Sequence, residues 1–177
     1  MKKILSLPAL LVVATFGLAS LFADETNPSN PPEVAYPEGY RDWHFVSSVV
    51  LPRKEDSANS AATGSKPALT SGLIHNVYAN EKAREGLRTG HFAEGSVLIA
   101  DWFVLEAAGP VLVQGPRKSI NVMVRDARYT STGGWGFEDF DKDSRTIRNV
   151  GQTAVKSCFE CHRRAEDREY VFSSLKP

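Results

Sequence analysis

Apolar residues occupy both alternating sets of positions between Gly95 and Leu105, which makes this the clearest strand pattern in the chain. A strand with one face in water would show a polar residue at every second position. We therefore predict a central strand that is covered on both faces. The first set holds Val97, Ile99, Asp101 and Phe103, and the second holds Ser96, Leu98, Ala100, Trp102 and Val104.

Shorter patterns predict the other elements. The run from His44 to Leu51 is apolar and β-branched and fits a strand or a short helix, and Pro52 ends it. Residues Ala79 to Arg88 have helical composition, with Gly90 as the stop signal. We also predict strands at Leu73–Tyr78, Ser119–Arg125 and Tyr170–Phe172, a glycine-rich turn at Thr132–Phe137, and a helix at Gln152–Arg164.

Two segments carry turn-forming residues in place of an apolar pattern. Asp24 to Pro37 contains four prolines, and proline this dense favours an extended chain without a core. Arg53 to Pro67 is rich in Ser, Ala, Gly and charge and is interpreted as a mobile surface loop. We therefore assign residues 24–35 as a flexible linker and residues 36–177 as one domain.

The N-terminus has the pattern of a secretory signal peptide. Lys2 and Lys3 precede an apolar run from Ile4 to Phe22, and small residues lead to a predicted cut after Ala23. The alternative is a retained membrane anchor, because the run is near the lower length limit for crossing a bilayer. No cysteine follows the run, which excludes a lipoprotein. The interpretation that we favour is export to the periplasm.

Composition narrows the classes of partner. Removing residues 1–23 leaves 154 residues, which suits one domain, with 19 basic and 21 acidic side chains and a net charge of −2. This balance argues against nucleic acid and against an anionic membrane surface as partners. We therefore predict no membrane contact after signal cleavage.

The segment Cys158-Phe-Glu-Cys-His162 has the C-x-x-C-H pattern of covalent haem attachment. Each cysteine can form a thioether with a haem vinyl group, and the histidine then serves as the proximal iron ligand. The chain has two cysteines, and both lie in this motif, which occurs once. One covalently bound haem c is the predicted cofactor, with His162 as the metal ligand.

Two alternatives to haem remain for this motif. A C-x-x-C pair can be a redox-active disulfide, but such pairs normally open a helix after a strand in a βαβ unit, and no such pattern precedes Cys158. A zinc site needs two further ligands, and no second C-x-x-C or H-x-x-x-H is present.

Seven ordered blocks resemble a known family. The blocks are Tyr36–Trp43, His75–Asn80, Phe92–Val97, Val122–Asp126, Gly133–Glu138, Cys158–His162 and Tyr170–Ser173, and together they look like the cytochrome P-460 and cytochrome c′-beta family. The resemblance covers nearly all of the chain from Pro32 to Leu175. It implies an α+β fold, mostly an antiparallel β-sheet with a C-terminal haem-bearing helix, in a periplasmic homodimer.

The family has two functional branches that differ at one lysine. In the P-460 branch, a strand lysine is cross-linked to the haem, and the enzyme oxidises hydroxylamine. In the c′-beta branch the bond is absent, and a five-coordinate haem in an apolar pocket binds nitric oxide. The resemblance puts the lysine position at Ala100, and no lysine occurs between Lys82 and Lys118. This departure puts hydroxylamine oxidation in doubt.

Residues on the distal side of the haem decide what the iron does. Trp102 and Phe45 are predicted to line an apolar pocket together with Ala100, and an ordinary core is the alternative. A catalytic carboxylate would be needed to move protons, and Glu106 and Asp126 are the candidates, with solvated strand ends as the alternative. The protein donors that could fill the sixth position are His44, His75, His91 and Met123, each more often found in packing or hydrogen-bonding roles.

Three functions follow in order of preference. The first is binding of a small gaseous or nitrogenous ligand, such as nitric oxide, at an open distal site. The second is hydroxylamine oxidation. The third is electron transfer with a protein sixth ligand. A periplasmic electron-transfer partner is expected in each case.

Overall fold

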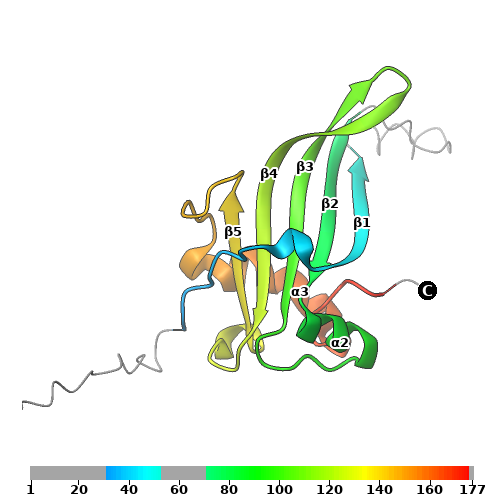
Figure 1. Ribbon diagram of the computed structural model, residues 1–177. Helices are drawn as coiled ribbons and strands as arrows, with labels where there is room; N and C mark the ends of the chain where they lie inside the picture. The colour runs from blue at the N-terminus through cyan, green and yellow to red at the C-terminus, as the bar shows by residue number, and fades with distance from the viewer. Residues whose placement is uncertain (1–30, 53–70, 176–177) are drawn as a thin grey trace, which may run out of the picture.

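The computed structural model describes residues 31–52 and 71–175, which form a five-stranded antiparallel sheet with helical segments packed against it (Figure 1). The strands stand in chain order, so each one pairs with its neighbour in the sequence. This arrangement confirms the α+β class with a C-terminal helix. The strands are β1 (His44–Pro52), β2 (Gly72–Ala79), β3 (Val97–Ala108), β4 (Val111–Arg125) and β5 (Trp135–Asp141).

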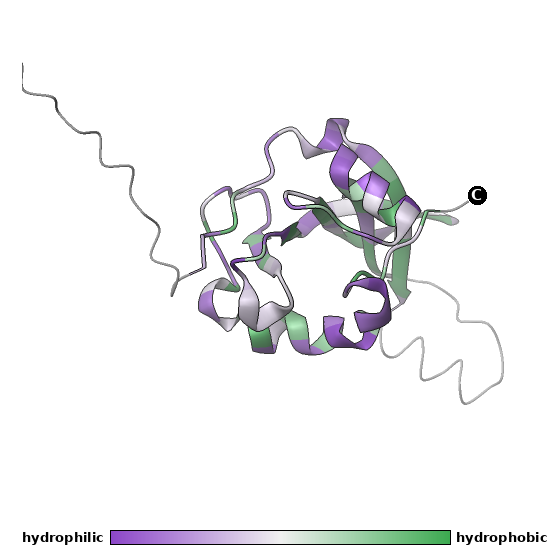
Figure 2. Ribbon diagram, turned by 90° about the horizontal axis from the view of Figure 1, so that it is seen from below, coloured by the Kyte–Doolittle hydropathy of each residue, from purple (hydrophilic) through white to green (hydrophobic). Residues whose placement is uncertain are grey.

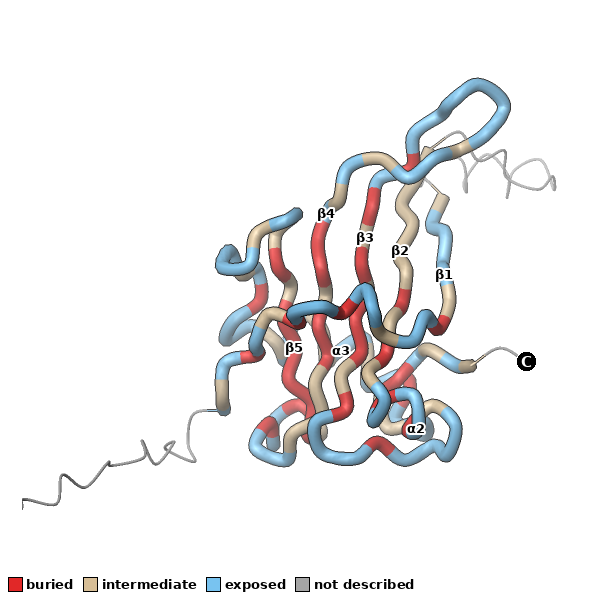
Figure 3. The backbone as a smooth tube through the Cα atoms, in the orientation of Figure 1, coloured by how far each residue is buried: buried red, intermediate tan, exposed pale blue. Residues whose placement is uncertain are grey.

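The β3 strand lies in the middle of the sheet and is covered on both faces, as its apolar pattern predicts. Alternate residues point to opposite faces of a sheet. Leu98 belongs to one buried cluster and Ile99 to another. Figure 3 shows buried residues running down β3, β4 and β5.

Each face of the sheet carries its own hydrophobic cluster. The helix-side cluster contains Val46, Val77, Ala79, Ala83, Phe92, Leu98, Met123, Trp135, Phe137 and Val171, and Cys158 and Phe159 pack against it. The opposite cluster contains Val34, Tyr40, Ile99, Ile120, Val122, Tyr129 and Phe140. We call the face with the first cluster the helix-side face. Figure 2 shows hydrophobic residues along the strands and mixed hydropathy on the helical segments beside them.

The predicted helix between the second and third strands is present as α2 (Glu81–Thr89). Asn80 caps its start, because the Asn80 side chain accepts a hydrogen bond from the backbone N–H of Ala83 at 2.9 Å. Gly90 ends it with φ 83°, the left-handed conformation that glycine adopts without steric cost. Both signals are visible in the sequence, which explains why the boundaries are close to those predicted.

Two strands differ from what the sequence predicted: β4 is longer than predicted, and β5 was not predicted as a strand. The β4 strand begins at Val111, not at Ser119, because its first half pairs with the end of β3 in an exposed hairpin arm that includes Gly115 (Figures 1 and 3). The β5 strand was interpreted partly as a glycine-rich turn. Gly136 lies within it because the Tyr129 ring approaches so closely that a Cβ there would lie 2.3 Å from the ring.

Four further predictions concern the first strand and the segments around the sheet. The run from His44 to Leu51 is a strand and not a helix. Tyr170–Phe172 is not a strand, since Tyr170 has a left-handed backbone. The loop at 53–67 lies outside the described residues. Residues 31–35 of the predicted linker pack against the domain, where the Tyr129 hydroxyl donates to the carbonyl of Pro32 at 2.7 Å.

Candidate functional site

The C-x-x-C-H motif lies on a run of helical turns from Gly151 to Arg168 that crosses the helix-side face (Figure 1). The run is longer than the predicted helix at Gln152–Arg164. It contains the short helices η3 (Gly151–Thr153), η4 (Val155–Phe159), α3 (Glu160–His162) and η5 (Arg163–Arg168). The η4 turn is π-helical, a rare form that is frequent at functional sites, and it includes Cys158. We call the whole run the motif helix.

The two cysteines are free thiols three positions apart, a spacing that puts both side chains on one side of a helical turn. Cys158 is half-buried against the helix-side cluster, and Cys161 is exposed. Burial raises the pKa of Cys158 to about 11, and the carboxylates of Asp139 and Glu138 act in the same direction. Redox-active C-x-x-C cysteines instead have a lowered pKa, so this environment does not favour a catalytic disulfide.

His162 is oriented by a hydrogen bond between its Nδ1 atom and the backbone carbonyl of Tyr170 at 2.7 Å. A carbonyl oxygen can only accept, so Nδ1 carries the proton and Nε2 presents a lone pair. The ring centroid lies 4.9 Å from that of Phe137 and 5.1 Å from that of Phe172. Burial lowers the pKa of His162, which keeps the ring neutral. A neutral imidazole with Nδ1–H donated to a carbonyl is ready to bind a metal through Nε2.

The strand register arranges the helix-side face in three rows of directly opposite residues, and opposite residues share a face. The row that includes Phe137, which we call the inner row, contacts the motif helix, because the Phe137 ring packs against the His162 ring. The inner row is Ala79, Leu98, Met123 and Phe137; the middle row is Val77, Ala100, Asn121 and Asp139; the outer row is His75, Trp102, Ser119 and Asp141. Ala100 and Trp102 therefore lie on the face that carries the motif helix, one and two rows beyond Leu98.

His75 has an unusual environment in the outer row. Its ring meets the Trp102 ring edge-on with centroids 4.2 Å apart. Its Nδ1 atom is buried and has no hydrogen-bond partner among the described residues. Burial lowers the pKa of His75 and favours the neutral ring. A buried polar atom without a partner is costly and is often explained by a ligand or functional role.

Phe45, a predicted pocket residue, lies on the other face of the sheet. It pairs with Tyr78, and the two ring centroids are 5.9 Å apart. Tyr78 packs against the opposite cluster, and Phe45 is 51% exposed. The β-bulge after Phe45 puts Val46 in the helix-side cluster instead. Simple alternation cannot reveal such a bulge in a sequence.

The carboxylates proposed as catalytic groups are at opposite ends of the sheet. Glu106 lies in the exposed hairpin arm, where it pairs with Val113. Asp126 follows β4 and forms an ion pair with Arg128, with 2.5 Å between Oδ2 of Asp126 and Nη2 of Arg128. The structure brings neither of them to the three rows. Asp139 is the carboxylate in the middle row, and the sequence showed no signal for it because β5 was interpreted partly as a turn.

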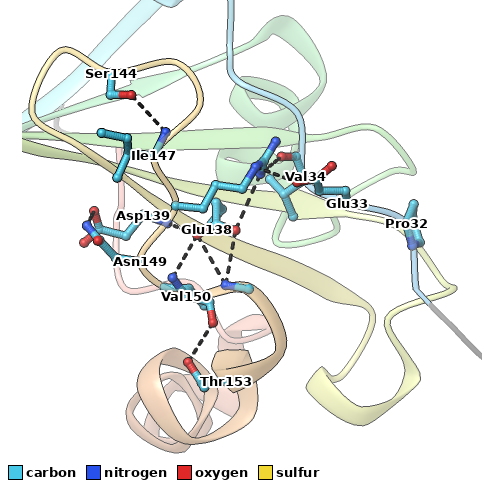
Figure 4. A network of polar contacts seen from close by, with 12 residues as sticks. Pro32, Glu33, Val34, Glu138, Asp139, Ser144, Ile147, Asn149, Val150 and Thr153 are labelled. Atoms are coloured by element: carbon cyan, nitrogen blue, oxygen red, sulfur yellow. Dashed lines mark hydrogen bonds and ion pairs between the residues drawn. The ribbon is translucent and has the colours of Figure 1, made fainter.

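Glu138 anchors the start of the motif helix and was also missed. Its side chain is 3% exposed, and its carboxylate accepts hydrogen bonds from the backbone N–H groups of Val150 at 3.0 Å and Gly151 at 3.2 Å (Figure 4). Arg148 forms an ion pair with the same carboxylate, with 3.5 Å between its Nη1 atom and Oε2 of Glu138. A carboxylate is the favoured acceptor for such unpaired N–H groups at a helix start. Glu138 thereby fixes the edge of β5 to the segment that carries the cysteines.

The other potential iron ligands are accounted for by their surroundings. Met123 is buried in the inner row, which fits packing. His44 is exposed, and the His91 side chain is 87% exposed beside Glu169. Among residues 31–52 and 71–175, no group of three or more His, Cys, Asp and Glu side chains gathers in a way that would hold a metal ion. The donor set therefore fits a haem iron, with the porphyrin supplying the remaining ligands, better than a zinc ion.

Comparisons with known proteins agree with this geometry. The family model described as Cytochrome P460 matches residues 37–173, which include β1 to β5 and the motif helix. No curated protein matches the chain. In the described part of the chain, no helix has the length and apolar character needed to cross a membrane.

Proposed function

The chain belongs to the cytochrome P460 family, and from this premise we propose that it is a periplasmic cytochrome with one covalent haem c whose open distal site binds small nitrogen-oxide ligands such as nitric oxide. Family membership makes the protein a haem-containing cytochrome. The finer proposal rests above all on Ala100, which occupies the middle row of the helix-side face where the resemblance would put a cross-linking lysine.

Cys158, Cys161 and His162 would hold the haem. Each thiol would add across one vinyl group, with sulfur bound to one carbon and the proton to the other, so attachment would need no oxidant. The raised pKa of Cys158 keeps that sulfur as a thiol. His162 offers the Nε2 lone pair, which its bond to Tyr170 directs away from the backbone.

The bound haem would supply one open iron position for a diatomic ligand. The chain's own contribution on that side is the helix-side face, which presents the small side chain of Ala100 beside the aromatic ring of Trp102. No lysine occurs on β3, and Lys82 is engaged elsewhere, donating to the carbonyl of Glu94 at 2.9 Å. On β4, Lys118 has no partner on β3, because the register shifts between the pairs Trp102–Ser119 and Phe103–Arg117, and its side chain is exposed. Among the described residues, none of the three rows of the helix-side face contains a lysine, which supports ligand binding over the cross-linked enzyme.

Hydroxylamine oxidation is the second candidate function, and Asp139 favours it. Turnover of an amine needs a group that accepts protons. Asp139 lies in the middle row with Ala100, and its Oδ1 atom is 3.3 Å from the Asn149 side-chain nitrogen. Electron transfer with a protein sixth ligand is the third candidate, and it is favoured by the Nδ1 atom of His75, which has no hydrogen-bond partner within residues 31–52 and 71–175.

An absorption spectrum of the purified, reduced protein separates these functions. We expect an unmodified five-coordinate haem c spectrum that changes when nitric oxide is added. A strongly red-shifted band from a cross-linked haem would contradict the assignment of Ala100. Rapid hydroxylamine oxidation with a chemical oxidant would favour the enzyme.

A sharp six-coordinate spectrum without added ligand would overturn the open site. The His75→Ala variant then identifies the ligand, since a return to five coordination would assign the sixth position to His75. Met123→Leu is the matched control, because it preserves the apolar packing of the inner row while removing the thioether.

Export and assembly are part of the same proposal. We propose that residues 1–23 are removed on export to the periplasm, that the mature protein is a homodimer, and that it exchanges electrons with a periplasmic partner. N-terminal sequencing of the exported protein should begin at Asp24. Retention of Met1 in the membrane fraction would contradict cleavage, and a monomeric mass in solution would contradict the dimer.

A further inference from the structure

The chain makes an unfavourable turn directly after the motif helix. Glu169 has φ 49° and Tyr170 has φ 68°, so two consecutive residues other than glycine have left-handed backbone conformations. Side chains with a Cβ atom rarely adopt this conformation, because the Cβ approaches the carbonyl oxygen. Such conformations persist where surrounding contacts hold them, and they cluster at functional sites.

The carboxylate of Glu169 provides the first of these contacts. Its Oε2 atom accepts a hydrogen bond from the backbone N–H of Phe92 at 3.2 Å, and its Oε1 atom lies 3.1 Å from Nδ1 of His91. The His91 side chain is 87% exposed, so its contact with Glu169 is a weak surface contact. The N–H of Phe92 is the firmer anchor, because the Phe92 ring is buried and packs against Trp135 with centroids 5.3 Å apart.

The ring of Tyr170 provides the second contact. It packs against Phe159 with centroids 5.1 Å apart. It also lies over Gly133, where an added Cβ would come within 2.5 Å of the ring. The backbone N–H of Tyr170 donates to the carbonyl of Ala165 at 2.7 Å. Both sides of the strained turn are therefore tied to the domain, one through Glu169 and the other through Tyr170.

The carbonyl of Tyr170 is the acceptor for Nδ1 of His162, so the strained turn determines where this acceptor lies. We propose that Glu169 is a positioning residue for His162, acting through the Tyr170 carbonyl. In Figure 1 the chain leaving the motif helix runs beside the loop after α2, the loop that contains His91 and Phe92. The inference rests on the proposed function, in which His162 is the proximal ligand of a haem.

The expected effect follows from the chemistry of imidazole. A strong Nδ1–H hydrogen bond makes Nε2 more basic, and a more basic ligand favours the ferric over the ferrous iron. Releasing Glu169 should let the Tyr170 carbonyl move and weaken this bond. The iron–histidine bond then weakens and the reduction potential rises.

The experiment compares the purified haem-containing protein with its Glu169→Ala variant. We expect the iron–histidine stretching band in the resonance Raman spectrum to move to lower frequency. We also expect the ferric-to-ferrous equilibrium to change about tenfold, the lower end of the usual effect of disturbing the hydrogen bond to a metal-ligating histidine. For one electron this is a rise in reduction potential of about 59 mV.

Four variants separate positioning from general damage. Glu169→Gln keeps an acceptor for the Phe92 N–H and should restore both readouts to near the wild-type values. Glu169→Gly removes the anchor but relieves the left-handed strain, so it should fold and still show the shifts. His91→Ala should have a small effect. Asp167→Ala changes an 80% exposed side chain two residues away and should have none.

Each remaining outcome has a distinct meaning. Unchanged Raman band and potential in both Glu169→Ala and Glu169→Gly would overturn the positioning role while leaving the haem assignment intact. An equal shift in Asp167→Ala would also overturn it, because the effect would then be a general loosening of the segment. Absence of covalent haem from the wild-type protein would instead overturn the proposed function.

Discussion

Replacing both Cys158 and Cys161 with alanine is expected to make all of the haem extractable by acidified organic solvent, whereas the wild-type protein should retain all of it. The two thiols are free, and the motif contains every cysteine in the chain. Without them no thioether can form, and His162 alone would hold the haem. The measurement is the haem absorbance that remains with the precipitated protein.

The single variants Cys158→Ala and Cys161→Ala are the matched controls for this test. Each retains one thioether, so the haem should stay with the protein, and its reduced absorption band should shift because one vinyl group is left unsaturated. The half-buried Cys158 packs against the helix-side cluster, so its loss should also reduce stability more than loss of the exposed Cys161. Haem that resists extraction from the double variant would contradict covalent attachment through this motif.

Ala100→Lys is expected to change the haem spectrum, because the new side chain would extend over the helix-side face. Ala100 is half-buried between Val77 and Asn121 in the middle row, next to the row that contacts the motif helix. A longer side chain there should lower the free energy of unfolding by about 1–3 kcal/mol, the usual cost of overpacking. Absorption spectra and urea denaturation of the haem-containing protein measure the two effects.

Phe45→Lys is the control for the lysine itself. Phe45 is on the opposite face and 51% exposed, so a lysine there adds the same charge without approaching the middle row. Its haem spectrum should match that of the wild-type protein. If Ala100→Lys also leaves the spectrum unchanged, the haem does not lie over this row, and the argument from the missing lysine loses its structural support.

Local signals in the sequence predicted the elements whose boundaries depend on a few neighbouring residues. The α2 helix was predicted because Asn80 and Gly90 have characteristic effects at helix ends. The β3 strand was predicted as central because its alternation is apolar on both sides. Tyr170–Phe172 was predicted wrongly as a strand, since three β-favouring residues cannot reveal a left-handed turn held by distant groups.

Distant contacts decided which polar residues serve the site. Glu106 and Asp126 were named as candidates for proton transfer, with solvated strand ends as the alternative, and the structure places both of them away from the three rows. Glu138 and Asp139 come near the motif helix only because β5 is the edge strand beside it. Glu169 meets Phe92 across a separation of 77 residues. No local periodicity encodes contacts of this kind.

The sequence by itself determined the haem motif, the family resemblance and the absence of lysine between Lys82 and Lys118, because these depend on residue types and spacing alone. Only the tertiary structure decided that Ala100 and Trp102 share a face with the motif helix and that Phe45 does not. It also decided which nitrogen of His162 is free. The physical reason is that a β-bulge, a strand register and a hydrogen bond to a distant carbonyl arise from chain packing, which sequence-local preferences do not specify.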